Sequence, residues 1–336
     1  MKSQNPLPAV IPGLIAALLL ALAARASHRL LVSWGIRPVG ELFIAIVAGL
    51  VCSGQARRWP RLGAGLKFCA RTLLKAGIVL MGSSLSLGLA LQTGARALGI
   101  IVSCIVMALA VTLAMGRRLG LHRRLCALVG VGTAICGASA IVTVAPILEA
   151  DDDEVGYGVA VITFFGALAI LLYPLLGRGL GLSDLQYAVW TGVGVHDTAQ
   201  VMAAGFAFSE RAGQLATVVK LARTVLLVPL ALALAWREKN GRSSTAALPW
   251  FVLGFFAFSA LRTAGDVLVN GAWWHQLVTR SAWAARFLVL TAMAGVGLGS
   301  RWAGLARLGW KGLAVGWGAA LAVGGLGLLL SRWLLA

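Results

Sequence analysis

Residues 123–149 read RRLCALVGVGTAICGASAIVTVAPILE, and the middle of this apolar stretch decides the kind of fold we expect. The stretch exceeds the about 20 residues of helix that cross the hydrocarbon core of a membrane. Its centre, residues 129–139, contains three glycines together with the hydroxyl groups of Thr133 and Ser139. Glycines loosen a helix, and an opened backbone is tolerated inside a membrane only where it faces protein or a water-filled cavity. We therefore predict a broken helix within a membrane domain.

The composition of the whole chain supports a membrane protein. Of its 336 residues, 60% are hydrophobic and 12% are charged, and the mean hydropathy is +0.89. A soluble domain is about 45–50% apolar and about 25% charged, so this chain lacks the charge needed to cover a water-facing surface. The net charge of +18 would suggest nucleic acid in a soluble protein, but here the basic residues lie in short gaps between apolar runs. We expect a lipid bilayer as the surroundings and no nucleic-acid partner.

Apolar runs of membrane-spanning length recur along the chain, and we count about eleven. They are residues 7–24, 39–53, 66–86, 94–115, 123–149, 155–176, 183–206, 212–236, 246–268, 280–300 and 310–335. No polar linker between them is long enough to separate soluble domains, so we predict one all-α, polytopic membrane domain. The first run is expected to be a retained helix rather than a signal peptide, because Lys2 is the only charge before it and Pro8 and Pro12 interrupt its start.

Basic residues in alternate gaps between the runs predict the orientation in a bacterial cytoplasmic membrane. One set of gaps, which includes Arg117, Arg124 and Arg178, holds 15 lysines and arginines, and the other set holds 8. Because basic residues favour the cytoplasmic side, the N-terminus is predicted in the cytoplasm and the C-terminus outside. The acidic cluster at residues 149–154 is then predicted to face outward, either as a solvated loop or as a vestibule that collects cations.

A short repeat predicts how the spans are organised. Ala70-Arg-Thr-Leu-Leu74 recurs as Ala222-Arg-Thr-Val-Leu226, offset by 152 residues, and each run follows a lysine. The offset pairs five spans of one half with five of the other, and an odd number of spans inverts the second half, as in many secondary transporters. We predict two inverted five-helix repeats, at residues 39–180 and 181–336, after an additional N-terminal helix and loop at 1–38. Their broken helices are expected near the membrane midplane.

The same offset predicts a partner for the break at residues 129–139. It maps this break onto the tenth span, where Ala294-Gly-Val-Gly-Leu-Gly-Ser300 is again rich in glycine. This run is interpreted either as a second broken helix or as a surface on which two helices pack closely through small residues.

A second polar stretch, Gly192-Val-Gly-Val-His-Asp-Thr-Ala-Gln200, lies inside an apolar run. Ionisable side chains within a membrane span are costly and indicate a functional site. His196 and Asp197 are adjacent, and Gln200 follows about one helical turn later. We therefore expect these side chains to face a cavity.

Basic side chains inside the apolar runs indicate an anionic ligand. Lys220 and Arg223 share one helix face, and Asp197 is their predicted internal counter-charge. Lys75 lies deeper in its run than Lys67 and Arg71, which are expected to reach the lipid headgroups. Helix N-termini at the breaks add positive potential and N–H donors, and lysine and arginine form strong bonds to oxyanions. A small inorganic or organic anion is the predicted substrate.

These motifs together resemble the YeiH-like family of bacterial inner-membrane proteins, a sulfate exporter family. The resemblance covers nearly the whole chain. It rests on Lys75–Gly82, Thr133–Ile141 with Pro146, Gly194–Val201, Lys220–Arg223 with Pro229, Pro249–Phe251 and Ala292–Leu298. The chain departs from the family at Gly297-Leu-Gly-Ser300, where a Gly-Leu-Thr run is usual.

The resemblance implies export of sulfate or organosulfonates. It also implies a fold similar to sodium/proton antiporters and bile-acid symporters, with a mobile core domain against a scaffold, commonly in a homodimer. The acid after the histidine varies between Asp and Glu in the family, which fits a carboxylate role for Asp197.

The resulting hypothesis is a secondary transporter that moves a small anion by alternating access. The predicted substrate-binding residues are Thr133, Cys136, Gly137, Ser139, Gln200, Lys220, Arg223 and Lys75, and the predicted ion-coupling pair is His196 and Asp197. A proton or sodium gradient is expected to drive transport, because the chain has no glycine–lysine motif for ATP. No cofactor and no metal are expected.

Two other classes of function are considered. Asp197 with a lysine partner would suit a cation/proton antiporter. Cys136 and His196 would be the nucleophile and base of an intramembrane enzyme, or His196 and Asp197 would bind a metal. We expect no enzymatic activity, because adjacent residues on a helix diverge by about 100° and no second histidine lies at ligand spacing. The five cysteines form no C-x-x-C pair, so disulfide and zinc frameworks are not expected either.

Overall fold

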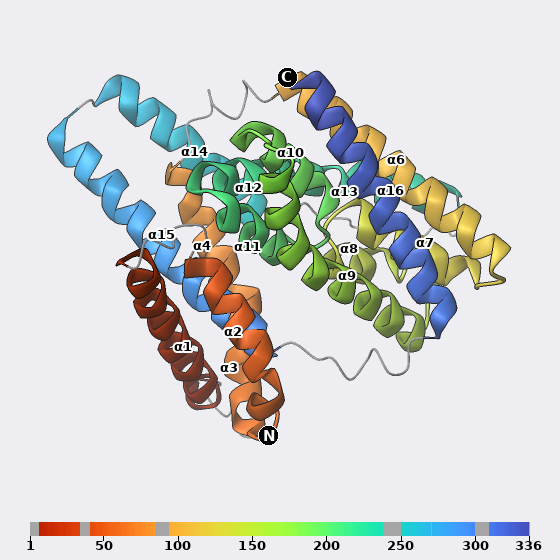
Figure 1. Cartoon of the computed structure of the whole chain (residues 1–336), viewed down its shortest axis with the longest axis horizontal. Helices are drawn as coiled ribbons and strands as arrows, with labels where there is room; N and C mark the ends of the chain where they lie inside the picture. Colours follow the sequence, from red (N-terminus) through yellow and green to blue (C-terminus); the bar gives the residue numbers. More distant parts are fainter. Residues whose placement is uncertain are drawn as a thin grey trace. The chain divides into compact units, whose positions relative to one another are not determined.

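The computed structural model describes residues 7–33, 41–84, 94–237, 250–269, 271–299 and 309–335, and every regular element in these ranges is a helix (Figure 1). The all-α prediction is therefore confirmed. Lys2, Pro249 and Ser300 lie outside the described residues. The chain forms two compact units: unit 1 is Met1–Gln92 with Trp250–Arg301, and unit 2 is Thr93–Pro249 with Trp302–Ala336. The predicted boundary between the repeats falls inside unit 2, and the inverted repeats stay a prediction.

Seven helical stretches among the described residues are long and apolar enough to cross a membrane. They are Ala9–Leu31, Arg96–Arg118, Asp153–Gly179, Glu210–Arg237, Trp250–Leu268, Ala272–Gly299 and Trp310–Leu334. These stretches confirm a protein that crosses the membrane several times. The other predicted runs contain shorter or interrupted helices, so the count of eleven spans is not confirmed.

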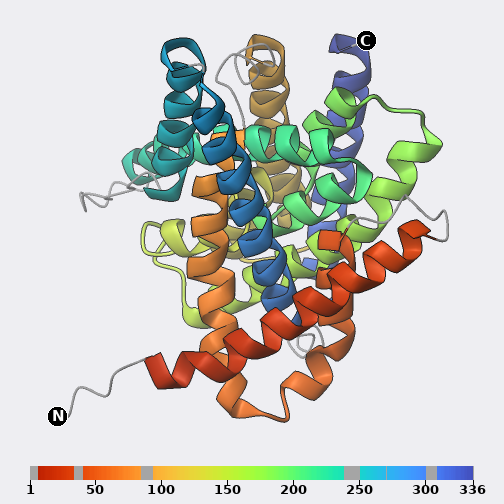
Figure 2. The same ribbon diagram turned by 90° about the vertical axis from the view of Figure 1, so that its left-hand side faces the viewer.

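Unit 1 is held together by close contacts between helices. Its elements are α1 Leu7–Ser33, α2 Glu41–Ala56, η1 Pro60–Leu62, α3 Gly63–Phe68, the π-helical turn η2 Cys69–Leu73, α4 Leu74–Met81, η3 Gly82–Ser84, α14 Trp250–Leu268 and α15 Ala272–Gly299. A Cβ added to Gly13 of α1 would lie 2.8 Å from the Cα of Gly65 in α3. Glycine thus lets two backbones touch, as small residues do in membrane helix pairs. Figure 2 shows α1 lying across α15.

The glycines of the tenth predicted span pack two helices together instead of breaking one. α15 is continuous from Ala272 to Gly299. A Cβ added to Gly297 would lie 2.8 Å from the Cα of Gly49 in α2, and one on Gly295 would lie 2.4 Å from the Cβ of Cys69. The interpretation of residues 294–300 as a second broken helix is therefore wrong over the part that the structure describes.

Unit 2 contains two interrupted helical segments among its longer helices. The first consists of α7 Arg123–Ala134 and α8 Ala138–Val144, and the second of α10 Asp184–Gly194 and α11 Thr198–Phe208. The other helices are α6 Gly94–Arg118, α9 Asp152–Gly179, α12 Glu210–Val225, α13 Leu227–Arg237 and α16 Trp310–Leu334. α6 and α16 run side by side (Figure 1). The first interruption lies within residues 129–139, where a break was predicted, and the second lies within the polar stretch 192–200.

Each interrupted segment turns back on itself as a hairpin. At the ends of the first segment, Arg124 donates a hydrogen bond to the carbonyl of Glu149 at 2.8 Å, and His122 Nδ1 lies 2.6 Å from Glu154 Oε1. At the ends of the second, Ser209 Oγ donates to Asp184 Oδ1 at 2.7 Å. Both ends of a segment thus lie at the same end of unit 2. We call residues 123–150 hairpin A and residues 184–208 hairpin B.

The two hairpins enter unit 2 from opposite ends. α9 has 28 residues and is therefore about 42 Å long. It begins beside the ends of hairpin A, where Glu154 meets His122. It finishes beside the ends of hairpin B, where Arg178 donates to the carbonyl of Ala207. The tips of the hairpins consequently point toward each other.

This arrangement corrects the predicted topology. Residues 123–149 enter and leave at one end of unit 2, whereas a single span from one side to the other was predicted. Glu149 and Glu154 lie at the same end as Arg124 and pair with Arg124 and His122, so the acidic cluster is not placed opposite these arginines. Arg178, assigned to the same side as Arg124, lies at the other end. The predicted orientation of the termini is not affected, because removing two spans leaves their number odd.

Candidate functional site

The tips of hairpins A and B meet at two buried cations of α12. The side chains of Lys220 and Arg223 are both 0% exposed. Lys220 Nζ donates to the carbonyl of Ile135 in hairpin A at 2.8 Å, and to the carbonyls of Val195 at 3.0 Å and His196 in hairpin B. An ammonium group has three N–H donors, so all of them are engaged.

Arg223 contacts the same two tips one turn further along α12. In hairpin A, its Nε donates to the carbonyl of Ala134 and one terminal nitrogen donates to the carbonyl of Thr133. In hairpin B, the other terminal nitrogen donates to the carbonyls of Val193 at 2.6 Å and Gly192 at 3.2 Å. One guanidinium group thus joins the two hairpins.

The carbonyls bound by Lys220 and Arg223 are those that the two breaks deprive of helical partners. The last four carbonyls of a helix have no N–H partner within it, and α7 and α10 both end at a tip. These helix ends also carry partial negative charge. The two cations therefore satisfy the broken backbone directly. Asp197, their predicted counter-charge, forms no salt bridge with either of them in the described chain.

Asp197 and Gln200 build the tip of hairpin B by starting α11. Asp197 Oδ1 accepts the N–H of Ala199 at 2.9 Å, and Gln200 Oε1 accepts the N–H of Asp197 at 3.1 Å, which is a capping box. Gln200 Nε2 also donates to the carbonyl of Thr163 in α9 at 3.2 Å. Gly166 of α9 provides the space, because a Cβ there would lie 1.8 Å from Gln200 Oε1.

Gly137 allows the tip of hairpin A to turn and to touch hairpin B. Its φ of 73° lies in the left-handed region that favours glycine. A Cβ at this position would lie 3.3 Å from Asp197 Oδ2 and 3.3 Å from the carbonyl oxygen of His196. Both the turn and the contact with hairpin B therefore require a residue without a Cβ at position 137.

Three polar side chains at or near the tips are buried without a hydrogen bond of good geometry within the described chain. They are the ring of His196, at both nitrogens, the hydroxyl of Thr133, and the hydroxyl of Thr191 in the last turn of α10. His196 is 2% exposed and Thr133 is 0% exposed. Buried polar groups are nearly always paired, so these groups have bonding capacity left for a ligand.

The remaining predicted site residues divide between the two units. Cys136 is buried at the tip of hairpin A. Ser139 lies in the first turn of α8, where its side chain is exposed and its carbonyl accepts a hydrogen bond from Thr143. Lys75 belongs to unit 1, where it is half-buried and its ammonium lies 5.6 Å from the centre of the Phe251 ring.

Sequence reasoning missed Tyr173, which supports the tip of hairpin B from α9. Its ring stacks on Trp190 at a centroid distance of 4.1 Å. A Cβ added to Gly194 would lie 2.3 Å from its hydroxyl oxygen. The available signal was a tyrosine followed by Pro174 inside an otherwise apolar run.

Comparison with known proteins finds membrane proteins along the length of the chain. The family model described as Conserved hypothetical protein 698 matches residues 12–316. A UPF0324 membrane protein of Streptococcus pyogenes serotype M3 is 34% identical over 320 residues, 91% of this chain and 92% of the relative. The UPF0324 membrane protein of Bartonella henselae is 34% identical over 306 residues, 89% of this chain and 86% of the relative. That of Clostridium tetani is 29% identical over 293 residues, 81% of this chain and 83% of the relative. No solved structure matches the chain.

Proposed function

Because the chain belongs to the family of UPF0324 membrane proteins, described as Conserved hypothetical protein 698, we propose that this multi-pass membrane protein is a secondary transporter for a small anion. The family membership confirms the family predicted from the motifs. The proposed substrate is sulfate or an organosulfonate, exported across the bacterial inner membrane by alternating access. The N-terminus is proposed to lie in the cytoplasm, and the working form is proposed to be a homodimer.

The meeting of the two hairpin tips around a buried positive charge is the observation that carries this proposal. Lys220 and Arg223 supply two positive charges and Asp197 one negative charge, which leaves a formal charge of +1. The negative ends of α7 and α10 are offset by the positive ends of α8 and α11. A buried charge without compensation is costly, so a bound anion is favoured over a bound cation.

His196 and Thr133 are the proposed direct contacts of the anion, because both have unused hydrogen-bonding capacity. Cys136 is buried at the same tip as Thr133, and Ser139 follows in the first turn of α8. Lys220 and Arg223 have most of their N–H groups engaged by carbonyls, so they are proposed to attract the anion through their charge while holding the tips together. This is a change from the direct contact expected from the sequence.

Alternating access is proposed to arise from the hairpins. Hairpin A enters from one end of unit 2 and hairpin B from the other, so a movement of either one exposes the tips to a different side. Broken or re-entrant elements of this kind surround the substrate in several transporter folds. His196 and Asp197, adjacent at the tip of hairpin B, are the proposed coupling pair for a proton or sodium ion.

A cation/proton antiporter is the second candidate, and one observation favours it. Asp197 is half-buried, and only its Oδ1 serves the cap of α11 among the described contacts. The second oxygen is therefore available to a proton or a sodium ion. Such an antiporter would need no anion.

Thermal unfolding of the purified protein with a panel of ligands tests the proposal. The panel contains sulfate, sulfite, thiosulfate, taurine, small carboxylates and sodium chloride as the ionic-strength control. A ligand that binds the folded state raises Tm with its concentration. We expect at least one sulfur oxyanion or sulfonate to raise Tm in the wild type and in His275→Ala, whose histidine is exposed, but not in His196→Ala. No response in the wild type, or an equal response in His196→Ala, would reject the site, and a response to sodium alone would favour the antiporter.

A further inference from the structure

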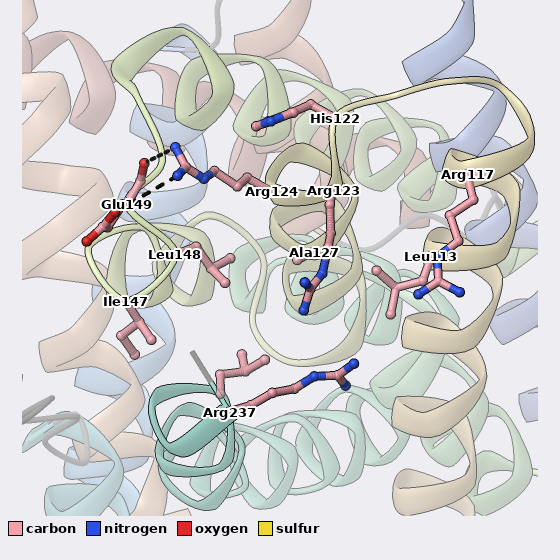
Figure 3. A pocket seen from close by; sticks show the side chains of 11 residues that line it. Leu113, Arg117, His122, Arg123, Arg124, Ala127, Ile147, Leu148, Glu149 and Arg237 are labelled. Carbon is pink, nitrogen blue, oxygen red and sulfur yellow. Dashed lines mark hydrogen bonds and ion pairs between the residues drawn. The ribbon is translucent and has the colours of Figure 1, made fainter. Parts of the chain in front are cut away.

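The end of unit 2 at which hairpin A enters contains a pocket lined by four arginines (Figure 3). Its volume is about 300 Å³. Arg117 comes from the last turn of α6, Arg123 and Arg124 from the first turn of α7, and Arg237 from the last turn of α13. In Figure 3, Arg117, Arg123 and Arg237 extend toward one open space, whereas Arg124 points to Glu149.

Basic side chains outnumber acidic ones in the lining of this pocket. Glu149 is the acid in the lining, and it is held by Arg124, which donates to its carbonyl at 2.8 Å and lies 3.9 Å from its carboxylate. The lining therefore has four arginines against one glutamate. Arg117 and Arg237 form neither an ion pair nor a hydrogen bond with any residue that the structure describes.

Basic residues at one edge of a membrane protein are common and need no ligand to explain them. This cluster differs because its guanidinium groups converge from three separate helices on one concavity. Like charges held together in this way repel one another, and a shared counter-anion removes the repulsion. Leu148 and Leu234 supply an apolar part of the lining, which suits the carbon portion of an organic anion.

We propose that the arginine pocket binds a phosphate group. The planar fork of a guanidinium matches two phosphate oxygens at once, and several arginines can share the three oxygens of one phosphate. The phosphate belongs either to a free phosphate ion or ester or to the headgroup of an anionic lipid, since basic pockets between membrane helices bind such headgroups. The site is separate from the hairpin tips and does not depend on the proposed transport function.

A bound phosphate would tie hairpin A to its neighbours. It would connect the start of α7 to the ends of α6 and α13. Within the described part of the chain, neither Arg117 nor Arg237 forms an ion pair with an acid. Binding to the folded state should therefore raise the thermal stability of the protein.

Thermal unfolding of the full-length protein in detergent tests this site with three probes. They are inorganic phosphate, dihexanoyl-phosphatidylglycerol and, as the zwitterionic control, dihexanoyl-phosphatidylcholine, at constant ionic strength. The test variant is Arg117→Gln/Arg237→Gln. The matched control is Arg96→Gln/Arg332→Gln, which removes the same charge at the opposite end of unit 2, where Arg96 donates to the carbonyl of Leu334.

We expect phosphate, phosphatidylglycerol or both to raise Tm in the wild type and the control. In the test variant the apparent affinity should fall about tenfold or more, because two charged hydrogen-bond donors are lost. A response to both probes identifies phosphate itself as sufficient, and a response to phosphatidylglycerol alone identifies a lipid headgroup. The proposal would be overturned if neither probe raised Tm in the wild type, or if the test variant responded as strongly as the wild type.

A second variant keeps every charged side chain and fills the pocket. Ala127→Phe places a ring in the pocket from α7, so it should weaken the same response about as much as the loss of two arginines. A normal response in a folded Ala127→Phe protein, judged by its elution volume and helical circular dichroism, would also count against the pocket.

Discussion

At Lys220 and Arg223, the hydrogen-bond donors of two buried cations are engaged by backbone carbonyls. The two side chains donate to carbonyls from both hairpins and are fully buried. Each carbonyl lies where a helix ends prematurely, so its hydrogen bond and its partial charge are both satisfied by the cation. Asp197 is thereby left to cap α11. This division of roles makes specific predictions for single residues.

Arg223→Met should destabilise the protein by about 3–5 kcal/mol, because it leaves buried carbonyls of both tips without donors. Arg211→Met is the control, since Arg211 lies on the same helix and is exposed. Thermal unfolding in detergent measures the difference. An Arg223→Met protein as stable as Arg211→Met would show that this side chain does not hold the tips.

Thr133→Val should leave stability unchanged or raise it by about 1 kcal/mol, because the hydroxyl it removes is buried without a hydrogen bond. The same change should weaken anion binding, since this hydroxyl is a proposed contact. Thr217→Val is the control: its hydroxyl is equally buried but donates to the carbonyl of Gly213 at 2.8 Å, so anion binding should stay normal. A clear loss of stability in Thr133→Val would mean that its hydroxyl already has a partner.

At the scale of elements, the account depends on two hairpins that touch at their tips. Gly137 makes this contact possible. Gly137→Ala should lower the free energy of unfolding by about 1–2 kcal/mol because residue 137 has a left-handed backbone. The loss should be larger still, because the added Cβ would press against Asp197 and the carbonyl of His196. Gly120→Ala is the control, because Gly120 has a φ of 67° but nothing within 4 Å of an added Cβ. Unfolding measurements that give both variants the same loss would contradict the tip contact.

If each hairpin turns back on itself, both of its ends should be accessible from the same side of the membrane. His122→Cys and Glu149→Cys should react with a membrane-impermeant maleimide from one side of the membrane, and Ser183→Cys and Glu210→Cys from the other. All four positions are exposed. Intact and inverted membrane vesicles measure the sidedness, with the wild type as the background control for its native cysteines. Labelling of positions 122 and 149 from opposite sides would restore a full span at 123–149.

The sequence predicted local features of these elements better than distant ones. The break in hairpin A was predictable because its glycines and hydroxyls lie within 11 residues. The break in hairpin B had a signal that was not used, since Asp197-x-x-Gln200 is a capping box inside an apolar run. The return of hairpin A was not predictable, because it depends on Arg124 meeting Glu149, 25 residues away. Hydropathy alone does not distinguish such a hairpin from a span.

The glycines at 294–299 misled the prediction for a physical reason. Glycine serves both a broken helix and a close helix pair, and the residues that decide between them lie on another helix. Gly297 meets Gly49 of α2, which no local pattern around residue 297 reveals. For the site, nine of the ten residues predicted from the motifs lie on the two hairpins and α12, and Lys75 lies on α4. The roles of Lys220, Arg223 and Asp197 required knowing which carbonyls were left free.

At the scale of the whole molecule, the central claim is that the hairpin tips carry a small anion across the membrane. The most direct test is counterflow of radiolabelled sulfate into proteoliposomes preloaded with each unlabelled anion of the panel, with and without proton and sodium gradients. The matched variants are His196→Ala and His275→Ala. We predict label uptake by the wild type and His275→Ala, accelerated by one of the two gradients, and loss of at least about 90% of it in His196→Ala, as expected when a transported ligand loses a buried hydrogen-bond partner. Uptake no faster than in protein-free liposomes for every anion, or full uptake by His196→Ala, would contradict the account.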